Sequence, residues 1–574
     1  MNRKLKNIIM SIILVVMIIV MAFTVINLKN DNSMPNMENN NQNESMNNNG
    51  EPPDIPTNNE NSGEGDMKEP PTNNGNMNEG GTPPDMPNNM NQKGNTSIKN
   101  YVVIGIEAFI ISSILIYLLM SKFNKKTFKE TFKNSDKVIM YILFIIIISI
   151  AITYLDNKLI STNDNNIQNN NQMNNNQNIT YSSEKEITSD ENIDSGTYSS
   201  EKKDTNAILV SNAKSTISNV TVNKTGDSSS RDSTSFYGNN SAIIAKNGST
   251  LTIKNAVINT DATGANGVFS YGGTASTTSS TGDGTTVNIS DSKITTTKDN
   301  SGGIMTTGGG SMNATNLTIN TSGTSSAAIR SDRGGGVVNV NKGTYKTTGV
   351  GSPSIYSTAD ISVSNAKLIS EASEGIVIEG KNKVSLDNVT LTDNNTKLNG
   401  KSTTYKNIFL YQSMSGDADN GTSEFIAKNS TITTNNGDTF YVTNTSASIT
   451  LENNTIVNND SDGNFLRAQK DSWGNINSNG GNVVLKMTNQ SVKGNIVIDS
   501  ISTLDITLSD NSKYEGAINA KNEAKSIKLK LDKTSKITLT GDSYITSLDN
   551  EDTTNSNIDF NGYKLYVNGV EINK

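Results

Sequence analysis

The chain contains no cysteine and no histidine among its 574 residues. Without cysteine it forms no disulfide and offers no thiolate to a metal ion. Without histidine it lacks the commonest general base and metal ligand in proteins. These absences exclude Ser–His and Cys–His nucleophilic chemistry and the zinc hydrolases.

Apolar residues are also scarce, at 33% of the chain, and aromatic residues make up 5%. Asn, Ser, Thr and Gly are abundant instead. Such a composition does not build a thick globular core, but it suits a solenoid with a narrow interior and it suits disordered spacers. The net charge of −8 argues against nucleic acid as a partner.

One six-residue pattern recurs along the last 370 residues: an apolar residue, any residue, Asn or Asp, two further residues and an apolar residue. Its first copies are Ile217–Val222, Ile253–Ile258 and Ile289–Ile294. The third positions are, in order, Asn219, Asn255, Asp291, Asn316, Lys342, Asn365, Asn388, Asn429, Asn453, Asn489 and Asp510. Successive copies lie 21 to 41 residues apart. A repeat of about 22 residues that tolerates insertions is typical of a β-solenoid.

The Asn position is expected at a corner of each coil, because a short amide tolerates left-handed backbone. Stacked coils then place Asn over Asn, and the side-chain amides hydrogen-bond along the stack. The pattern therefore predicts an Asn ladder.

Three long apolar segments precede the repeats, and each has the length of a membrane-spanning helix. We expect transmembrane helices at 1–29, 100–121 and 138–155, a basic cytoplasmic loop at 122–137, disordered segments at 30–99 and 156–204, and the solenoid at 205–574. The positive-inside rule predicts a multi-pass protein of the cell membrane with a cytoplasmic N-terminus and an extracellular solenoid. A cleaved signal peptide is the alternative for the first segment.

A second apolar strand precedes each corner, and its alternation predicts which residues face outward. The outward residues are Leu209, Ile244, Phe269, Met305, Arg330, Tyr356, Val377, Phe409, Tyr441 and Arg467, which we call the stripe. Two residues further along lie Tyr271, Asp332, Glu379 and Tyr411. An apolar and aromatic stripe of this length usually marks a binding surface.

Arginine is rare, with five residues in the whole chain, and Arg330, Arg333 and Arg467 fall on or beside the stripe. Arginine pairs with carboxylates, and aromatic rings stack on sugars, so the stripe could follow an extended polysaccharide. The predicted ligand-binding residues are Phe269, Tyr271, Arg330, Tyr356, Phe409, Tyr411, Tyr441, Arg467 and Trp473. The alternative is that inserted loops cover the stripe and bury it as a side core.

Long insertions follow the same strand at Gly272–Gly284, Ser413–Ser423 and Lys470–Gly481. They are expected at one corner, where they could wall a groove. Trp473, the single tryptophan, lies in the third. In the second, Asp417 and Asp419 resemble half of a calcium loop, although short Asp, Asn and Gly runs are more often turns. We expect no cofactor, with calcium at these two residues as the alternative.

Residues of about 205 to 550 resemble the right-handed parallel β-helix domains of bacterial surface proteins, a superfold shared with pectate lyases and many adhesins. The phrases Ser326–Gly336 and Tyr411–Asp417 are similar to ones in adhesin-like proteins of Gram-positive anaerobes. The resemblance implies an all-β, right-handed parallel β-helix, with about 11–13 coils. It also implies that a catalytic site, if present, would use Arg330, Asp332 and Arg333, because pectate lyases use an arginine base and Asp-bound calcium.

The sequence therefore favours a membrane-anchored β-helix that binds polysaccharide or a surface partner. A polysaccharide lyase or hydrolase is the first alternative, but paired carboxylates are not evident in neighbouring coils, and an unperturbed arginine is a poor base. A structural surface component without a ligand is the second alternative, and it predicts that loops cover the stripe.

Overall fold

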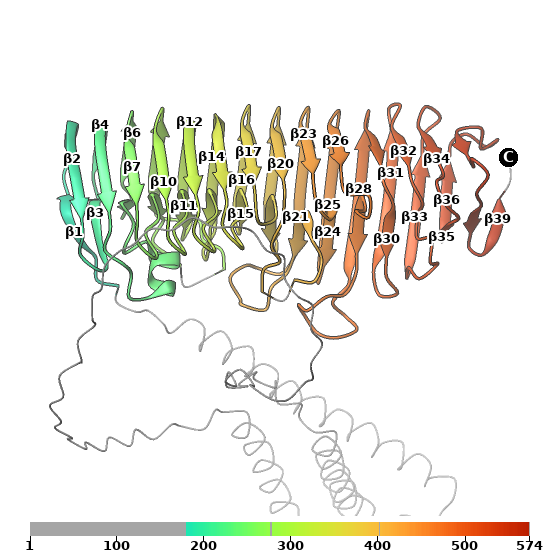
Figure 1. Ribbon diagram of the computed structural model, residues 1–574, viewed down its shortest axis with the longest axis horizontal. Helices are drawn as coiled ribbons and strands as arrows, with labels where there is room; N and C mark the ends of the chain where they lie inside the picture. The colour runs from blue at the N-terminus through green and yellow to red at the C-terminus, as the bar shows by residue number, and fades with distance from the viewer. Residues whose placement is uncertain (1–178, 276–277, 401, 573–574) are drawn as a thin grey trace, which may run out of the picture. The chain divides into compact units, whose positions relative to one another are not determined.

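A computed structural model describes residues 179–275, 278–400 and 402–572 of the chain. These residues form a rod of stacked β-coils, in which each turn of the chain adds a strand to each long face (Figure 1). Nearly all strand pairs are parallel, and a parallel pair joined by a crossover is right-handed. The predicted right-handed parallel β-helix is confirmed.

The prediction of three transmembrane helices was wrong for the fold that the structure describes. In the described ranges, no helix has the length and apolar character needed to cross a bilayer, and the one helix is the five-residue π-helix η1 (Ser233–Tyr237). The predicted spans at 1–29, 100–121 and 138–155, the spacer at 30–99 and the loop at 122–137 lie outside the described residues. The fold class is corrected to all-β, and a multi-pass membrane localisation is not supported.

One long face is a 12-stranded sheet, which we call sheet A. It comprises β1 (Ser182–Ile187), β3 (Thr205–Ser211), β5 (Ile243–Lys246), β8 (Val268–Tyr271), β11 (Ile304–Thr307), β13 (Ile329–Ser331), β15 (Ile355–Ser357), β18 (Ile376–Glu379), β21 (Lys406–Tyr411), β24 (Asp438–Thr443), β27 (Leu466–Ala468) and β30 (Ile496–Ile498).

A 20-stranded sheet, folded at the Asn corners, forms two further faces, B1 before the corner and B2 after it. Strands that pass through the corner are β2 (Asn192–Ser200), β4 (Lys214–Lys224), β12 (Gly310–Thr321) and β14 (Gly336–Thr347). Face B1 also contains β6 (Thr250–Lys254), β9 (Thr286–Ser290), β16 (Asp360–Ser364), β19 (Lys383–Asp387), β22 (Thr422–Lys428), β25 (Thr445–Glu452), β28 (Gly481–Thr488), β31 (Thr503–Ser509), β33 (Ser526–Leu531) and β36 (Ser547–Asn550). Face B2 also contains β7 (Val257–Thr260), β10 (Lys293–Thr296), β17 (Lys367–Ser370), β20 (Thr390–Asp393), β23 (Thr431–Thr434) and β26 (Thr455–Asn458).

Two small sheets complete the last coils. Next to β26 lies a four-stranded sheet of β29 (Ser491–Lys493), β32 (Lys513–Glu515), β34 (Lys536–Thr538) and β37 (Ile558–Asp559). A three-stranded sheet consists of β35 (Ser543–Ile545), β38 (Leu565–Val567) and β39 (Val570–Ile572), and its β38–β39 hairpin is antiparallel. At the other end, β1 and β2 lie within the predicted 156–204 linker, so the β-helix begins before residue 205.

The predicted corner is confirmed, since each of its eleven residues from Asn219 to Asp510 has a positive φ. The amides also stack: Asn388 Nδ2 donates to Asn365 Oδ1 at 2.8 Å, and Asn453 Nδ2 donates to Asn429 Oδ1 at 2.8 Å. Two steps of the ladder differ: Asn365, which follows the Lys342 coil, bonds to Asn341 Oδ1 at 2.9 Å, and Asn429 bonds to Asp387 Oδ1 at 3.2 Å. Asn at a left-handed position thus fixes where each coil turns.

The predicted register of sheet A is also confirmed. Ile208, Ile243 and Val268 are paired neighbours whose side chains lie in the core, and Leu209, Ile244 and Phe269 are paired one residue later. The same pairing continues through Arg330 and Tyr356 to Tyr441 and Arg467. The outward stripe is therefore a continuous row along the rod.

Candidate functional site

The stripe is not an open surface, because loops cover most of it. At the N-terminal end, η1 and its loop place Phe236 over Leu209, Ile244, Phe269 and Met305 to form a buried cluster. A Cβ on Gly238, which has a φ of 69°, would lie 2.6 Å from the Phe269 ring, so the loop approaches this ring as closely as glycine allows. The expectation of an exposed stripe was wrong at this end, where these side chains are buried. The covering is favourable because it removes the apolar area of the rings from water.

A second cluster covers the C-terminal part of the stripe. Phe409 and Tyr411 stack with ring centroids 4.4 Å apart, and Trp473 packs against both at 5.3 and 5.4 Å. Tyr441 is fully buried beside Phe409, with centroids 5.8 Å apart. Phe409, Tyr411 and Tyr441 are buried, and Trp473 is half-buried against them, so the cluster does not present an open row of ring faces to sugars.

Arg467 is engaged in a similar way. Its Nε donates to Asp438 Oδ2 at 2.5 Å, and Asp438 also accepts from the backbone and side-chain amides of Asn464. Asp438 is buried, so the pair anchors the end of one coil on the next.

Between the two clusters the stripe opens into a polar recess of about 280 Å³. Its inner residues are Arg330, Asp332, Tyr356 and Tyr411. The other lining residues are Arg231, Asp232, Ser235, Phe236, Ser325, Ala327, Gly351, Asn399 and Asp417. Five of the predicted site residues therefore lie together, namely Arg330, Asp332, Tyr356, Tyr411 and Asp417. The others do not line this recess: Phe269, Tyr271, Arg333, Phe409, Asp419, Tyr441, Arg467 and Trp473.

The central pair of the recess is Arg330 and Asp332, which are 7% and 6% exposed. Arg330 Nη2 donates to Asp332 Oδ2 at 3.0 Å and to Ser235 Oγ at 3.3 Å. Burial raises the pKa of Asp332 to about 6, although the adjacent guanidinium acts in the opposite direction. A carboxyl group with such a pKa can hold or release a proton near neutral pH.

Glu379 lies two coils away, behind the recess, and is almost wholly buried. It accepts hydrogen bonds from the hydroxyls of Tyr356, at 2.5 Å, and Tyr411, at 3.2 Å. Ser413 Oγ also donates to it. Burial raises the pKa of Glu379. This carboxyl group orients the two phenols that line the recess.

Of the described residues in the three predicted insertions, only those of Ser413–Ser423 line the recess, through Asp417. Arg333 Nε donates to Asp417 Oδ1 at 2.5 Å, and its guanidinium lies 4.3 Å over the Phe236 ring. Asp419 accepts from Thr278 and, at 2.9 Å, from Ser279, so two loops about 140 residues apart are joined.

Asp417 and Asp419 lie on the same loop but accept hydrogen bonds from different partners. The described part of the chain contains no group of three or more acidic, His or Cys residues arranged to hold a metal ion. The calcium alternative at these two residues gains no support from their contacts.

The sequence interpretation missed two features of the recess. The negative charges of Asp417 and Glu379 both raise the pKa of Asp332, so three carboxyl groups from separate coils lie near one another. Arg231, on the loop before η1, lies at the mouth. The rarity of arginine could have identified it, because Arg231 is the fourth arginine of the β-helix.

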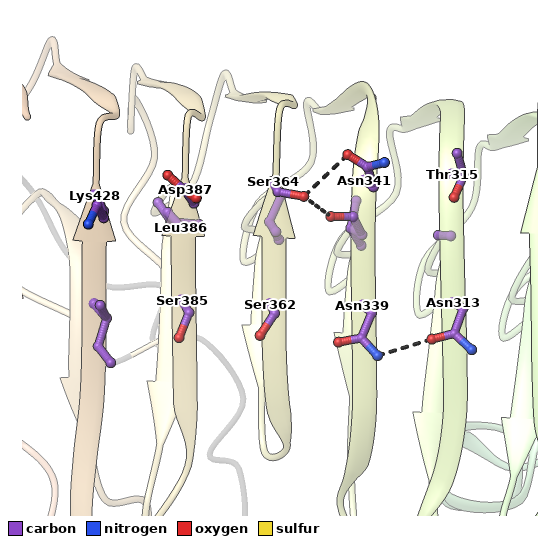
Figure 2. A pocket seen from close by; sticks show the side chains of 14 residues that line it. Asn313, Thr315, Asn339, Asn341, Ser362, Ser364, Ser385, Leu386, Asp387 and Lys428 are labelled. Carbon is purple, nitrogen blue, oxygen red and sulfur yellow. Dashed lines mark hydrogen bonds between the residues drawn. The ribbon is translucent and has the colours of Figure 1, made fainter.

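A larger groove of about 470 Å³ lies on the outer side of face B1 (Figure 2). Ser362, Ser364 and Ser385 leave space between longer side chains on the neighbouring coils. Asn339 Nδ2 bonds to Asn313 Oδ1 at 3.0 Å, and Ser364 Oγ bonds to Asn341 Oδ1 at 3.3 Å. The groove follows from small side chains on an open sheet and contains no buried charged pair, so the smaller recess is the better candidate site.

No family model matches this chain, and the searches of curated proteins and of solved structures give no match either.

Proposed function

We propose that this β-helix is an adhesin-like module that binds a polysaccharide, with one sugar unit lodged in the Arg330 recess. The observation that carries the proposal is the opening itself, since polar groups line a recess in a face that is covered on both sides. Guanidinium, carboxyl and phenol groups match the donors and acceptors of sugar hydroxyls. A partner molecule on another surface that carries such sugars would bind in the same way.

Arg231 adds a preference within this proposal. It is exposed at the mouth and forms no ion pair among the described residues. A free guanidinium at the mouth favours a polymer that carries carboxylates, because arginine binds them with two parallel hydrogen bonds.

Two alternatives stay beside this proposal. The covering of most of the stripe is what a structural role without a ligand predicts. A lyase or hydrolase activity is favoured by one observation, the raised pKa of Asp332 in a polar recess. The proposal and the two alternatives differ in whether the recess binds a sugar and whether it cleaves one. One set of measurements separates them.

The test uses the full chain and titrates it calorimetrically with a polyuronate and with a neutral polysaccharide. Arg231→Ala and Asn399→Ala remove exposed groups at the mouth and leave the core untouched. Each is expected to weaken binding of the polyuronate about tenfold, the usual cost of a lost hydrogen bond to a charged group. Alanine at Phe269 or Tyr441 is unsuitable, because both side chains are fully buried.

Lys254→Ala is the matched control, since Lys254 is an exposed cation on face B1 away from the recess. It is expected to bind as the unaltered protein does. Equal affinity in all four proteins would contradict the proposed site, and absence of binding to any polysaccharide would favour the structural role. Release of shortened or unsaturated sugars that is lost in Asp332→Asn would favour the enzyme.

A further inference from the structure

The recess is short along the axis of the rod. Four residues of the stripe are successive register partners here, in the order Met305, Arg330, Tyr356 and Val377. Met305 is buried in the cluster that the η1 loop covers, and Val377 is buried in the second aromatic cluster. Arg330 and Tyr356, between them, line the recess. Coils repeat every ~4.8 Å, so two coils open over about 10 Å of the rod.

One side of the recess is closed by side chains that link three loops. Arg333, on the turn after β13, donates from Nε to Asp417 of the second insertion, and its guanidinium lies 4.3 Å over the Phe236 ring of η1. Asp417 and Phe236 in turn line the recess. Asp419 anchors the same insertion, because it accepts a hydrogen bond from Ser279 Oγ at 2.9 Å. The three loops are thus joined into one wall.

The recess has its mouth between two loops. Arg231 and Asp232 precede η1, and Asn399 lies on the loop before β21; all three are exposed. The other lining residues are buried or half-buried. A Cβ on Gly351, whose φ is 60°, would lie 2.6 Å from Asn399 Nδ2, so this amide lies against the backbone of the rim. Access from solvent is therefore concentrated at one place on the recess.

The size and the single mouth together limit what the recess can hold. Its volume of about 280 Å³ lies just below the range of about 300–1,000 Å³ for pockets that enclose a drug-sized ligand, so it suits one sugar ring. A unit inside a linear polysaccharide carries two linkages, which leave the ring in different directions and need two openings. A terminal unit or a side-branch unit carries one linkage and needs one opening.

Given the sugar-binding function proposed above, we propose that the recess recognises a sugar unit with a single linkage, namely the end or a side branch of an acidic polysaccharide. The ring enters between Arg231 and Asn399, and its hydroxyls meet Asp332 and Tyr411 at the inner end. Arg231 pairs with the carboxylate of the unit at the mouth. The protein therefore holds a polymer at its tips and does not follow it along the rod.

The test is calorimetric titration of the full chain with linear oligouronates of increasing length that share the same end units. Affinity per chain is expected to reach its final value by the trimer, and a long polyuronate should bind within about threefold of it. The amount of bound protein should stay at no more than one molecule per chain end at every length. Bound protein that rises in proportion to chain length would contradict end recognition while leaving the proposed function intact.

Two further probes separate the ends from the side branches. Reduction of the reducing-end sugar to an open-chain alditol removes its ring, so loss of binding assigns the recess to that end and retained binding assigns it to the other. A xylan with single glucuronic acid side units, titrated beside unsubstituted xylan, presents the branch. Binding of this xylan at one protein per side unit, without binding of the linear oligouronates, assigns the recess to a branch. Each of these results supports a unit with one linkage.

Asn399→Trp narrows the mouth and tests where the single unit binds. Asn399 is exposed and its amide lies against Gly351, so the added ring should block entry and weaken binding about tenfold or more. Lys397→Trp is the matched control, because Lys397 is exposed on the same loop and does not line the recess; it should bind as the unaltered protein does. Equal affinity of the two variants would overturn the proposal. Failure of the unaltered chain to bind any of the probes would instead contradict the sugar-binding function itself.

Discussion

At the scale of single residues, the recess depends on Asp332, a carboxyl group kept from water beside a guanidinium. Burial favours its neutral form, and Arg330 at 3.0 Å favours its charged form. Burial prevails, because the pKa rises from 3.8 to about 6. Asp332 can therefore bind a sugar hydroxyl either as a donor or as an acceptor, depending on pH.

The raised pKa of Asp332 gives a prediction for stability against pH. Between pH 3.8 and about 6 the folded chain binds a proton that the unfolded chain releases. The stability that this group contributes is complete below pH 3.8 and is lost as pH rises through about 6. Its size is at most about 3 kcal/mol. Asp332→Asn should therefore reduce the fall in urea midpoint between pH 4 and pH 7.

The matched control for this prediction is Asp360→Asn, which removes an exposed carboxylate from the outer side of β16. It should keep the pH dependence of the unaltered protein. An Asp332→Asn protein whose midpoint falls just as steeply would show that burial of this group does not set the pH dependence.

At the scale of the structural element, the corner stack decides how each coil turns. Lys342 occupies this corner with a φ of 66°, where a residue other than Asn or Gly is strained. Lys342→Asn should relieve this strain and restore an amide to the ladder. The expected gain is about 0.5–1 kcal/mol in the free energy of unfolding, measured by urea denaturation.

Lys367→Asn tests whether the gain belongs to the corner. Lys367 is an exposed lysine within β17, where the backbone is extended and Asn has a low β propensity. This change should leave stability equal or slightly lower. A similar gain from both substitutions would place the effect in lost lysine charge and not in the corner.

Corner and register could be predicted from the sequence because both are local. Asn at a left-handed position and alternation along a strand are properties of a few neighbouring residues, as in the pairs of Leu209 with Ile244 and Tyr441 with Arg467. The covering of the stripe could not be predicted in this way. It depends on contacts such as Asp419 with Thr278, which are 141 residues apart, and on the direction in which each loop folds.

At the scale of the whole molecule, the rod is quasi-one-dimensional, so each coil is stabilised mainly by its two neighbours. The β38–β39 hairpin packs on the last described coil. Leu565 is fully buried there, and the Tyr544 and Tyr566 rings stack 4.8 Å apart. The antiparallel hairpin also hides the edge of β35, since β38 pairs with it.

Removal of residues 563–574 should therefore expose the β35 edge and the Tyr544 ring. An uncovered parallel edge accepts strands from another copy, so the shortened chain is expected to self-associate as its concentration rises. Sedimentation velocity over a hundredfold range of concentration measures this directly. Glu571→Gln is the control, because it breaks only the 3.0 Å ion pair with Lys564 and retains the hairpin. A shortened chain that sediments with the same coefficient at every concentration as this control would show that the hairpin does not protect the end of the rod.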